Sequence, residues 1–522
     1  MPTDIARFFA RTAAFFAAAL VFAAPAQADW HKAETDRFVI YSDSDARDIR
    51  AFAERLERYH MAMAKLSGFD PAVPSPSNRV TVYAVGSDRT LRKLYGDTGS
   101  NVAGFYIPRA GGSVAFVPNV RLRGGETDFT LIVLMHEYAH HFFLSATPYA
   151  LPRWITEGSA EFFAAARFQN DGGVDLGLPA NHRVGDLNFA DQLSIEEILD
   201  YDRVVAENGR RRDGFYGQAW LLFHYLMFHE TRFAQYGEYA RLYMQGMPSL
   251  QAAEQAFGDL GELEKELKAY QRSRRIPAQR LPAKLLPIGQ ITVSELSEGM
   301  NEMMDVILKS RRGVNHEEAL ELLPVAREIA AEFPQDAGVL AALAEAEYDA
   351  GNDAEAIMAA DRALALDPSR KNAYVQKGYA LFRMASDEED QDAAYDRAME
   401  PFTALNQMEP DHPLPLIYYY RSFVQRGMRP EENAKLALKR ASELAPFDQG
   451  LRLNVGMMLI GERLNQAART TLAPLAADPH GTGAAQKARQ LIAVLEKTPD
   501  GTPVDMSALV ADSDKEDTES GG

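Results

Sequence analysis

The amino-acid sequence predicts an α+β domain, with a sheet near the N-terminus and a helical second lobe, followed by an all-α solenoid of helical repeats. Three observations support this order. Short runs rich in β-branched and aromatic residues, typical of strands, occur before residue 119. Apolar residues at helical spacing then dominate as far as residue 275. From about residue 298, a degenerate sequence motif that ends in proline recurs along the chain.

The composition limits the class of protein. A chain of 522 residues can bury more than one core, and 46% hydrophobic with 25% charged residues is ordinary for a globular protein. The formal net charge of -19 argues against nucleic acid and anionic membrane surfaces as main partners. The chain has no cysteine, so disulfides, thiol nucleophiles and cysteine zinc sites are excluded.

Residues 1–28 have the pattern of a secretory signal peptide. Two arginines, Arg7 and Arg11, precede the apolar run 15–24, and small residues at 26–28 offer a cleavage site. A retained membrane anchor is the alternative, but the run is short for a span and no second one follows. We therefore expect a periplasmic or secreted protein with no stable membrane span after cleavage. The absence of cysteine favours a bacterial periplasm.

The first domain is predicted to cover residues 29–275. Its first part alternates strand-like runs with one helical stretch, 45–66. The strand-like runs are 38–41, 80–85, 104–107 and 114–117, the last two joined by a hairpin turn. From residue 127 onward the pattern is helical throughout. The helical stretches are 131–143, 154–168, 216–229 and 233–245. Three prolines then punctuate residues 276–297, which the pattern predicts as a linker.

Residues 298–497 carry the repeats. Their phrases end at Pro334, Pro368, Pro410 and Pro446, with spacings of 34, 42 and 36 residues. This pattern resembles the tetratricopeptide repeat, in which small residues let two helices pack closely and a proline ends the second. Stacked pairs leave a concave groove, so we expect a protein partner there. An unrelated helical bundle is the alternative. The acidic tail, 498–522, is predicted to be disordered.

The chemistry centres on one short segment of the stretch 131–143. His136 and His140 are four residues apart, so on a helix both imidazoles can reach the same ion. Zinc accepts imidazole nitrogen and, in catalytic sites, keeps one position for water. Glu137 can accept a proton from that water. The spacing alone also occurs by coincidence.

A second segment supplies carboxylates. Glu157 can complete a set of two histidines and one glutamate, and Glu161, one turn later, can hold the free N–H of a ligand histidine. The alternative is a solvated helix face. Against it, both carboxylates lie among large apolar residues such as Trp154 and Phe162, a poor setting for idle charge.

Together the two segments resemble the gluzincin metallopeptidases, in particular their compact peptidase MA-like branch, over about residues 30–275. The matching positions are His136, Glu137, His140, Pro152, Trp154, Glu157, Gly158, Ala160 and Glu161. The resemblance implies a zincin-like fold, Zn2+ bound by His136, His140 and Glu157, and Glu137 as general base. The interval from His140 to Glu157 is shorter than in aminopeptidase-N-like enzymes, so we expect a tighter loop.

The resemblance also implies finer roles. Tyr216 stands where family members place a tyrosine that stabilises the oxyanion, with simple aromatic packing as the alternative. Residues 112–117 are either an edge strand that pairs with substrate or an internal hairpin strand. In aminopeptidases of this clan, a glutamate in a glycine-rich segment before the zinc helix binds the free amine of the substrate. No such glutamate accompanies Gly111 and Gly112, so an endopeptidase is favoured.

Two other histidines, His141 and His182, are considered as metal ligands. His141 points about 100° away from His140 on a helix and is not expected to bind the ion. His182 is an alternative third ligand, although no surrounding pattern supports it. The expected function is therefore an exported zinc endopeptidase that acts on a peptide or protein substrate and recognises a protein through its repeats. The alternative is a non-enzymatic scaffold with a structural or inactive zinc lobe.

Overall fold

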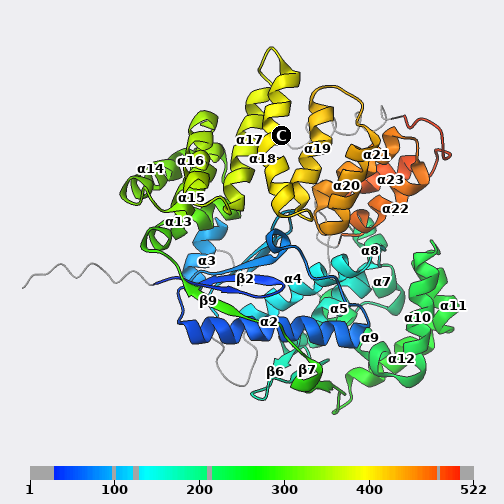
Figure 1. Ribbon diagram of the computed structural model, residues 1–522. Helices are drawn as coiled ribbons and strands as arrows, with labels where there is room; N and C mark the ends of the chain where they lie inside the picture. The colour runs from blue at the N-terminus through cyan, green and yellow to red at the C-terminus, as the bar shows by residue number, and fades with distance from the viewer. Residues whose placement is uncertain (1–28, 97–101, 121–128, 209–213, 479–482, 506–522) are drawn as a thin grey trace, which may run out of the picture.

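The structure is a computed structural model that describes residues 29–96, 102–120, 129–208, 214–478 and 483–505. The predicted signal segment 1–28 and residues 506–522 of the predicted tail lie outside these described residues. Among the helices that are described, none is long and apolar enough to cross a membrane. Figure 1 shows an N-terminal domain beneath an arch of helical repeats, the repeat domain.

A six-stranded mixed sheet organises the N-terminal domain, in the order β4-β5-β3-β2-β1-β9. The strands are β1 (His31–Glu34), β2 (Phe38–Ser42), β3 (Val80–Ala84), β4 (Phe105–Ile107), β5 (Val114–Val117) and β9 (Thr292–Glu295). The central strands β2, β3 and β5 run parallel, and the outer ones pair antiparallel. Because β5 lies between β3 and β4, the segment 112–117 is an internal strand and not an edge strand.

Both faces of this sheet are buried, by different parts of the chain. Successive side chains of a strand point to opposite faces. On β3, Val82 belongs to the main core with α2 (Ala46–Ser67) and α4 (Phe129–Ala146). Its neighbour Tyr83 belongs to a second cluster that includes Met304 and Leu308 of α13 (Glu298–Arg312), the first repeat helix. The sheet therefore joins the two domains.

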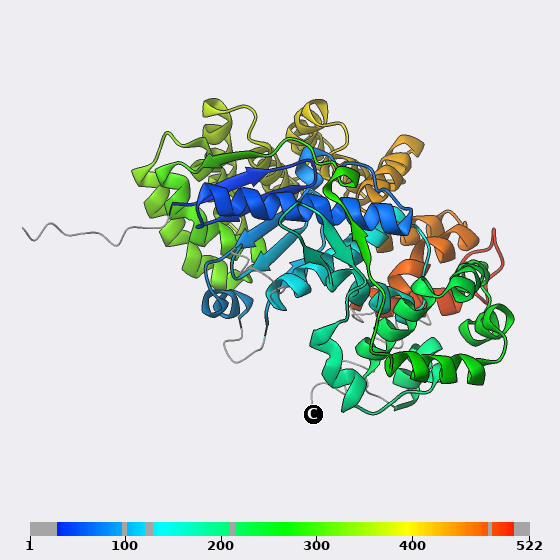
Figure 2. The same cartoon turned by 90° about the horizontal axis from the view of Figure 1, so that it is seen from below.

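A helical lobe follows α4 and projects to one side, as Figure 2 shows. Its larger helices are α5 (Arg153–Ala164), α8 (Tyr201–Asn208), α9 (Phe215–Phe228), α10 (Glu230–Met244), α11 (Ser249–Phe257) and α12 (Leu260–Gln271). The prediction of an uninterrupted helical pattern is wrong at one place. After Ala164 the chain forms β6 (Arg167–Phe168) and β7 (Val174–Leu176), because Gly172, with φ +80°, turns it back on itself.

The stretch predicted as a linker, 276–297, is part of the N-terminal domain. It contains β8 (Gln279–Leu281), which pairs with β7, and β9, which pairs with β1. Leu281 and Leu286 are buried in the main core. The sequence pattern missed these strands because each is only three or four residues long, too short to show a period against the nearby prolines.

The repeat domain starts with α13 at Glu298, where the repeats were expected to begin. Its remaining helices are α14 (His316–Glu332), α15 (Ala337–Asp349), α16 (Asp353–Leu366), α17 (Lys371–Ala385), α18 (Gln391–Met408), α19 (Pro413–Gln425), α20 (Glu432–Leu444), α21 (Gln449–Gly461), α22 (Asn465–Ala476) and α23 (Gly483–Leu495). They form a TPR-like helical repeat solenoid. Small residues permit close packing, since a Cβ on Gly456 of α21 would lie 2.5 Å from Leu472 Cδ2 of α22.

The beginning of the predicted disordered tail is ordered. The backbone of residues 498–505 returns to the last repeat, where Asn465 Nδ2 donates to Pro499 O at 2.8 Å and Gly501 N donates to Arg463 O at 2.9 Å. Asn465 is almost completely buried, so its amide needs these acceptors.

Direct polar contacts dock the repeat domain on the N-terminal domain. Asn78 Nδ2 donates to Leu444 O at 2.6 Å, and Ala110 N donates to Asp448 Oδ2 at 2.7 Å. Ser77 donates to both carboxylate oxygens of Glu409, through its backbone N and its Oγ, each at 2.9 Å. The repeat domain is thus bound by the segment before β3 and by the tip of the β4–β5 hairpin.

Candidate metal centre

Helices α4 and α5 bring together the three residues that were predicted as metal ligands. His136 and His140 are one turn apart on α4, and each is 9% exposed, while Glu157 of α5 is 0% exposed. The two helices pack in the core through residues such as Leu134 and Ile155. Gly158 lets α5 press against α9, because a Cβ there would lie 2.5 Å from Ala219 O. The adjacent Glu157 is then directed at α4.

The three donor atoms form a nearly equilateral triangle. His136 Nε2 is 3.1 Å from His140 Nε2 and 3.3 Å from Glu157 Oε2. The third side, from His140 Nε2 to Glu157 Oε2, is 3.5 Å. A tetrahedral ion about 2.1 Å from each donor requires donor separations of about 3.4 Å. Neither oxygen of Glu157 makes a hydrogen bond of normal geometry within the described chain. The arrangement suits a divalent ion with one further position open.

The electrostatics of the three side chains keep the carboxylate of Glu157 charged. Burial alone would raise the pKa of Glu157, but His136 and His140 outweigh it and hold that pKa well below its usual range. For His136, burial would lower the pKa, but Glu157 and Glu161 raise it to about 10. A metal ion would compete with the proton of this imidazole, because a ligand histidine must be neutral.

Glu161 supports the triad from behind. Its Oε1 is 3.2 Å from His136 Nδ1, the ring nitrogen that faces away from the other donors. Its Oε2 is 2.6 Å from His182 Nε2, and Arg183 donates to Oε1. Such a carboxylate fixes the orientation of a ligand histidine. His182 is therefore a partner of Glu161, and the alternative that made it the third ligand is wrong.

The role of His182 and Arg183 could not be predicted from the sequence, for a structural reason. They lie in the short η2 segment (Asn181–Arg183), well after Glu161 in the chain, and no local pattern links them. Only the folding of this segment onto α5 brings both side chains to one carboxylate. Their contacts help hold the pKa of Glu161 well below its usual range despite burial.

The two remaining residues of the sequence-based prediction are His141 and Tyr216. His141 is not a donor to the triad, as expected: its Nδ1 is 2.6 Å from Tyr106 Oη, and burial lowers its pKa to about 3. Tyr216 lies in the first turn of α9, with the Arg183 guanidinium carbon 4.8 Å from its ring centroid. Its part in stabilising an oxyanion stays a prediction.

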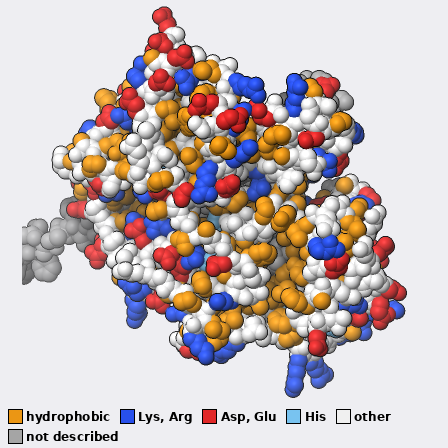
Figure 3. Space-filling model, turned by 45° about the vertical axis from the view of Figure 1, so that its right-hand side comes forward, with side chains coloured by type: hydrophobic (Ala, Val, Ile, Leu, Met, Phe, Trp, Pro, Cys, Tyr) orange, Lys and Arg blue, Asp and Glu red, His pale blue; other side chains and the backbone are white. Residues whose placement is uncertain are grey.

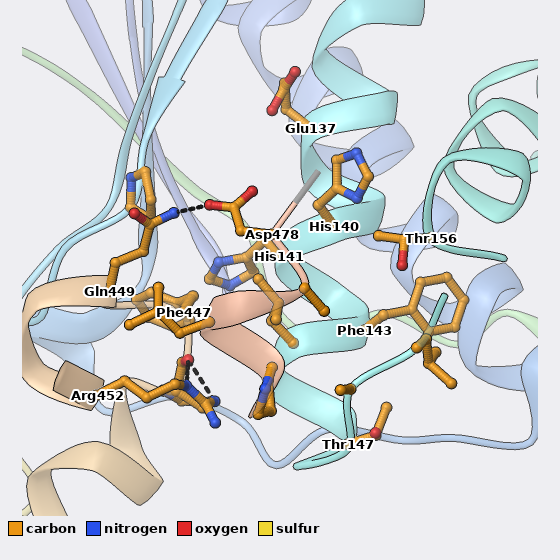
Figure 4. A pocket seen from close by; sticks show the side chains of 18 of the residues that line it. Glu137, His140, His141, Phe143, Thr147, Thr156, Phe447, Gln449, Arg452 and Asp478 are labelled. Atoms are coloured by element: carbon orange, nitrogen blue, oxygen red, sulfur yellow. Dashed lines mark hydrogen bonds between the residues drawn. The ribbon is translucent and has the colours of Figure 1, made fainter. Parts of the chain in front are cut away.

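A cavity of about 370 Å³ opens beside the predicted metal ligands. Glu137 and His140 of α4 lie in its wall, next to each other in Figure 4. Edge strand β4 and the loop after α4 form further parts of that wall. The opposite side belongs to the repeat domain and is called here the repeat wall. It consists of Pro446, Phe447, Gln449, Arg452, Pro474, Leu475, Ala477 and Asp478. Nothing in the sequence linked these residues to the motif.

Comparisons with known proteins name no activity. A family model described as a protein of unknown function (DUF1570) matches residues 134–243, which include the triad and Glu161. Among curated proteins, none matches the chain.

Solved structures that are similar include several helical-repeat proteins. A thermophilic TPR protein of Thermus thermophilus matches with 16% identity over 37% of this chain and 99% of its own, at a TM-score of 0.33. MamA of Desulfovibrio magneticus matches with 18% identity over 39% of this chain and 97% of its own, at a TM-score of 0.27. Yeast Tom70 matches with 10% identity over 87% of this chain and 74% of its own, at a TM-score of 0.27.

Proposed function

We propose that this protein is an exported, zinc-dependent endopeptidase. The observation that carries the proposal is the triangle of His136, His140 and Glu157 donors, with Glu137 beside it in the wall of a cavity. Structural zinc sites are closed by four protein ligands, whereas catalytic sites have three and an open position. Three donors next to a cavity favour the catalytic kind.

The residues around the triad have distinct tasks in peptide hydrolysis. When bound, zinc supplies a water of lowered pKa and polarises the substrate carbonyl. Glu137 accepts the proton of the attacking water at its carboxylate and delivers it to the amine nitrogen that leaves. Glu161 holds the His136 ring in place through Nδ1. Tyr216 is the candidate donor to the oxyanion.

The edge strand β4 supports a peptide as the substrate. Its outer side pairs with no strand of the described chain, and Phe105 and Tyr106 of β4 line the cavity. An extended peptide can add to such an edge by main-chain hydrogen bonds. We therefore propose β4 as the pairing strand, one strand further out than the sequence-based hypothesis had it.

The alternative function is a non-enzymatic scaffold in the periplasm. In that case the repeat domain binds a protein partner and the triad is structural or inactive. The high burial of His136 and Glu157 agrees with such a role. Glu137 distinguishes the two functions, because a structural zinc site has no use for a carboxylate that is half-buried in a cavity wall.

The decisive experiment measures zinc and hydrolysis on the same preparations. We expect about one zinc per wild-type chain by elemental analysis and cleavage of an unfolded protein substrate within the chain. Glu137→Gln should keep the zinc and lose hydrolysis by about 10²- to 10⁴-fold or more. Glu254→Gln, an exposed glutamate on α11, is the matched control. A folded wild-type protein that binds no zinc overturns the proposal, and zinc binding without cleavage favours the scaffold.

A further inference from the structure

The repeat wall reaches the immediate surroundings of the metal ligands. Phe447 lies in the loop before α21, and its ring centroid is 4.4 Å from that of His141, the residue after the ligand His140. Leu475, near the end of α22, is 3% exposed and lines the same cavity. Figure 4 shows Phe447 across the cavity from α4.

The loop that carries Phe447 is held from both sides. Asn78 binds Leu444 O just before it, and Asp448 just after it accepts the Ala110 N–H. Arg452 Nη2 donates to Pro446 O at 2.7 Å, so α21 also fixes the loop. Phe447 therefore keeps one position relative to α4, which is a requirement for a residue that shapes a binding pocket.

The cavity is apolar between its two walls. Phe105, Phe143 and Leu151 line it from the N-terminal domain, opposite Phe447, Pro474 and Leu475. Polar groups of the repeat wall are engaged with the protein itself: Gln449 donates to Asp478, and Arg452 donates to Pro446 O. Figure 3 shows hydrophobic side chains gathered along a hollow on one face of the molecule. At about 370 Å³ the cavity is in the range of small-ligand pockets.

We propose that this cavity binds one bulky apolar side chain of a polypeptide substrate beside the bond that is cleaved, and that Phe447 and Leu475 of the repeat domain set its size. The inference rests on the proposed function, since it concerns the substrate of the same site. It gives the repeats a direct part in substrate selection, because they supply one wall of the pocket.

The test uses two substitutions with opposite effects on the cavity. Phe447→Ala enlarges it, and Ala477→Phe fills it from a half-exposed position without removing a core side chain. For each variant, kcat/KM is compared for peptides that carry alanine, phenylalanine or naphthylalanine next to the cleaved bond. We expect the wild type to prefer phenylalanine to alanine about tenfold or more. Ala477→Phe should abolish this preference, and Phe447→Ala should shift it toward naphthylalanine.

A binding measurement separates the pocket from the chemistry. In the Glu137→Gln background, calorimetry with the same peptides should give the same order of affinities without cleavage. Leu451→Ala is the control for general damage to the repeats, because Leu451 is buried in α21 but is not part of the cavity lining. It should lower stability and leave the preference unchanged.

The outcomes distinguish the two proposals. If both folded cavity variants keep the wild-type order of peptides, or the wild type does not discriminate, the pocket assignment is wrong. If Phe447→Ala does not fold, Ala477→Phe alone decides. Zinc-free protein, or zinc without cleavage by any variant, defeats the proposed function, while binding to the Glu137→Gln variant still reports on the pocket.

Discussion

The two walls of the cavity differ in how they are built. On the α4 side, charged and titratable groups lie close together: the donors of His136 and Glu157 are 3.3 Å apart in a buried setting. On the repeat side, aromatic and aliphatic groups dominate, and their position depends on contacts between domains such as Ala110 to Asp448. In our proposal the first wall is the reaction centre and the second selects the substrate.

This difference implies that substitutions on the two sides have separable effects. Damage on the α4 side should change metal content and rate for every substrate alike. Damage on the repeat side should leave the metal in place and change which substrates are used. The effects should be largest for the proposed metal ligands and smallest for the contacts that dock the repeat domain.

Removal of a proposed metal ligand should have the largest effect. Glu157→Ala removes the third donor and leaves only the two histidines. Zinc content should therefore fall from about one per chain to a small fraction, and hydrolysis should disappear with it. Elemental analysis after dialysis and a peptidase assay measure both. Near-stoichiometric zinc in a folded Glu157→Ala protein contradicts the assignment of this residue.

Loss of the supporting carboxylate should have an intermediate effect. Glu161→Gln keeps the shape but removes the charge that faces His136 Nδ1, so zinc affinity should fall about 10- to 100-fold. Competition with a chelator measures the affinity. His182→Gln, one step further from the ion, should cost less. If both variants bind zinc as the wild type does, Glu161 has only a structural role.

A change in the repeat docking should have a smaller and selective effect. Asp448→Ala removes the acceptor of the Ala110 N–H and frees the loop that carries Phe447. We expect the preference for a bulky apolar residue to shrink by about a few-fold, because the loop keeps its other contacts, from Asn78 to Leu444 O and from Arg452 to Pro446 O. Zinc content should not change. An unchanged preference would show that other contacts hold the loop.

Acid should weaken the docking slightly. Burial alone would raise the pKa of Glu409, but Lys371 and Ser77 outweigh it and lower the pKa from 4.5 to about 2. Its contribution to stability is therefore complete above pH 4.5 and is lost as the pH falls toward 2. Urea unfolding at about pH 5 and about pH 3 measures this. The stability gap between wild type and Glu409→Gln should narrow at the lower pH, and a constant gap contradicts the assignment.

The grouping of His136, His140 and Glu157 could be predicted because its signals are local. The separation of His136 from His140 determines that they share a face of any helix, whatever surrounds it. Carboxylates among Trp154 and Phe162 indicate a use for the charge in the core. Helices such as α4, α5 and α9 are long enough for their period to be recognised, and the structure contains all three within a few residues of their predicted ends.

Short elements and distant contacts could not be predicted in this way. Strands β6 to β9 have too few residues to establish a period, so the stretch predicted as a linker contains two sheet strands instead. Which strand forms the sheet edge depends on the pairing of β3 with β5, and this is a non-local choice.

The amino-acid sequence by itself determined the triad, its neighbouring carboxylate Glu137 and the repeats, since these follow from spacing along one or two helices. Only the tertiary structure decided that His182 and Arg183 support Glu161 and that Phe447 and Leu475 complete the cavity. The reason is physical. The η2 segment folds onto α5 within the N-terminal domain, whereas Phe447 and Leu475 reach the cavity because the sheet packs against α13 and the β4–β5 hairpin binds Asp448. No local pattern encodes either contact.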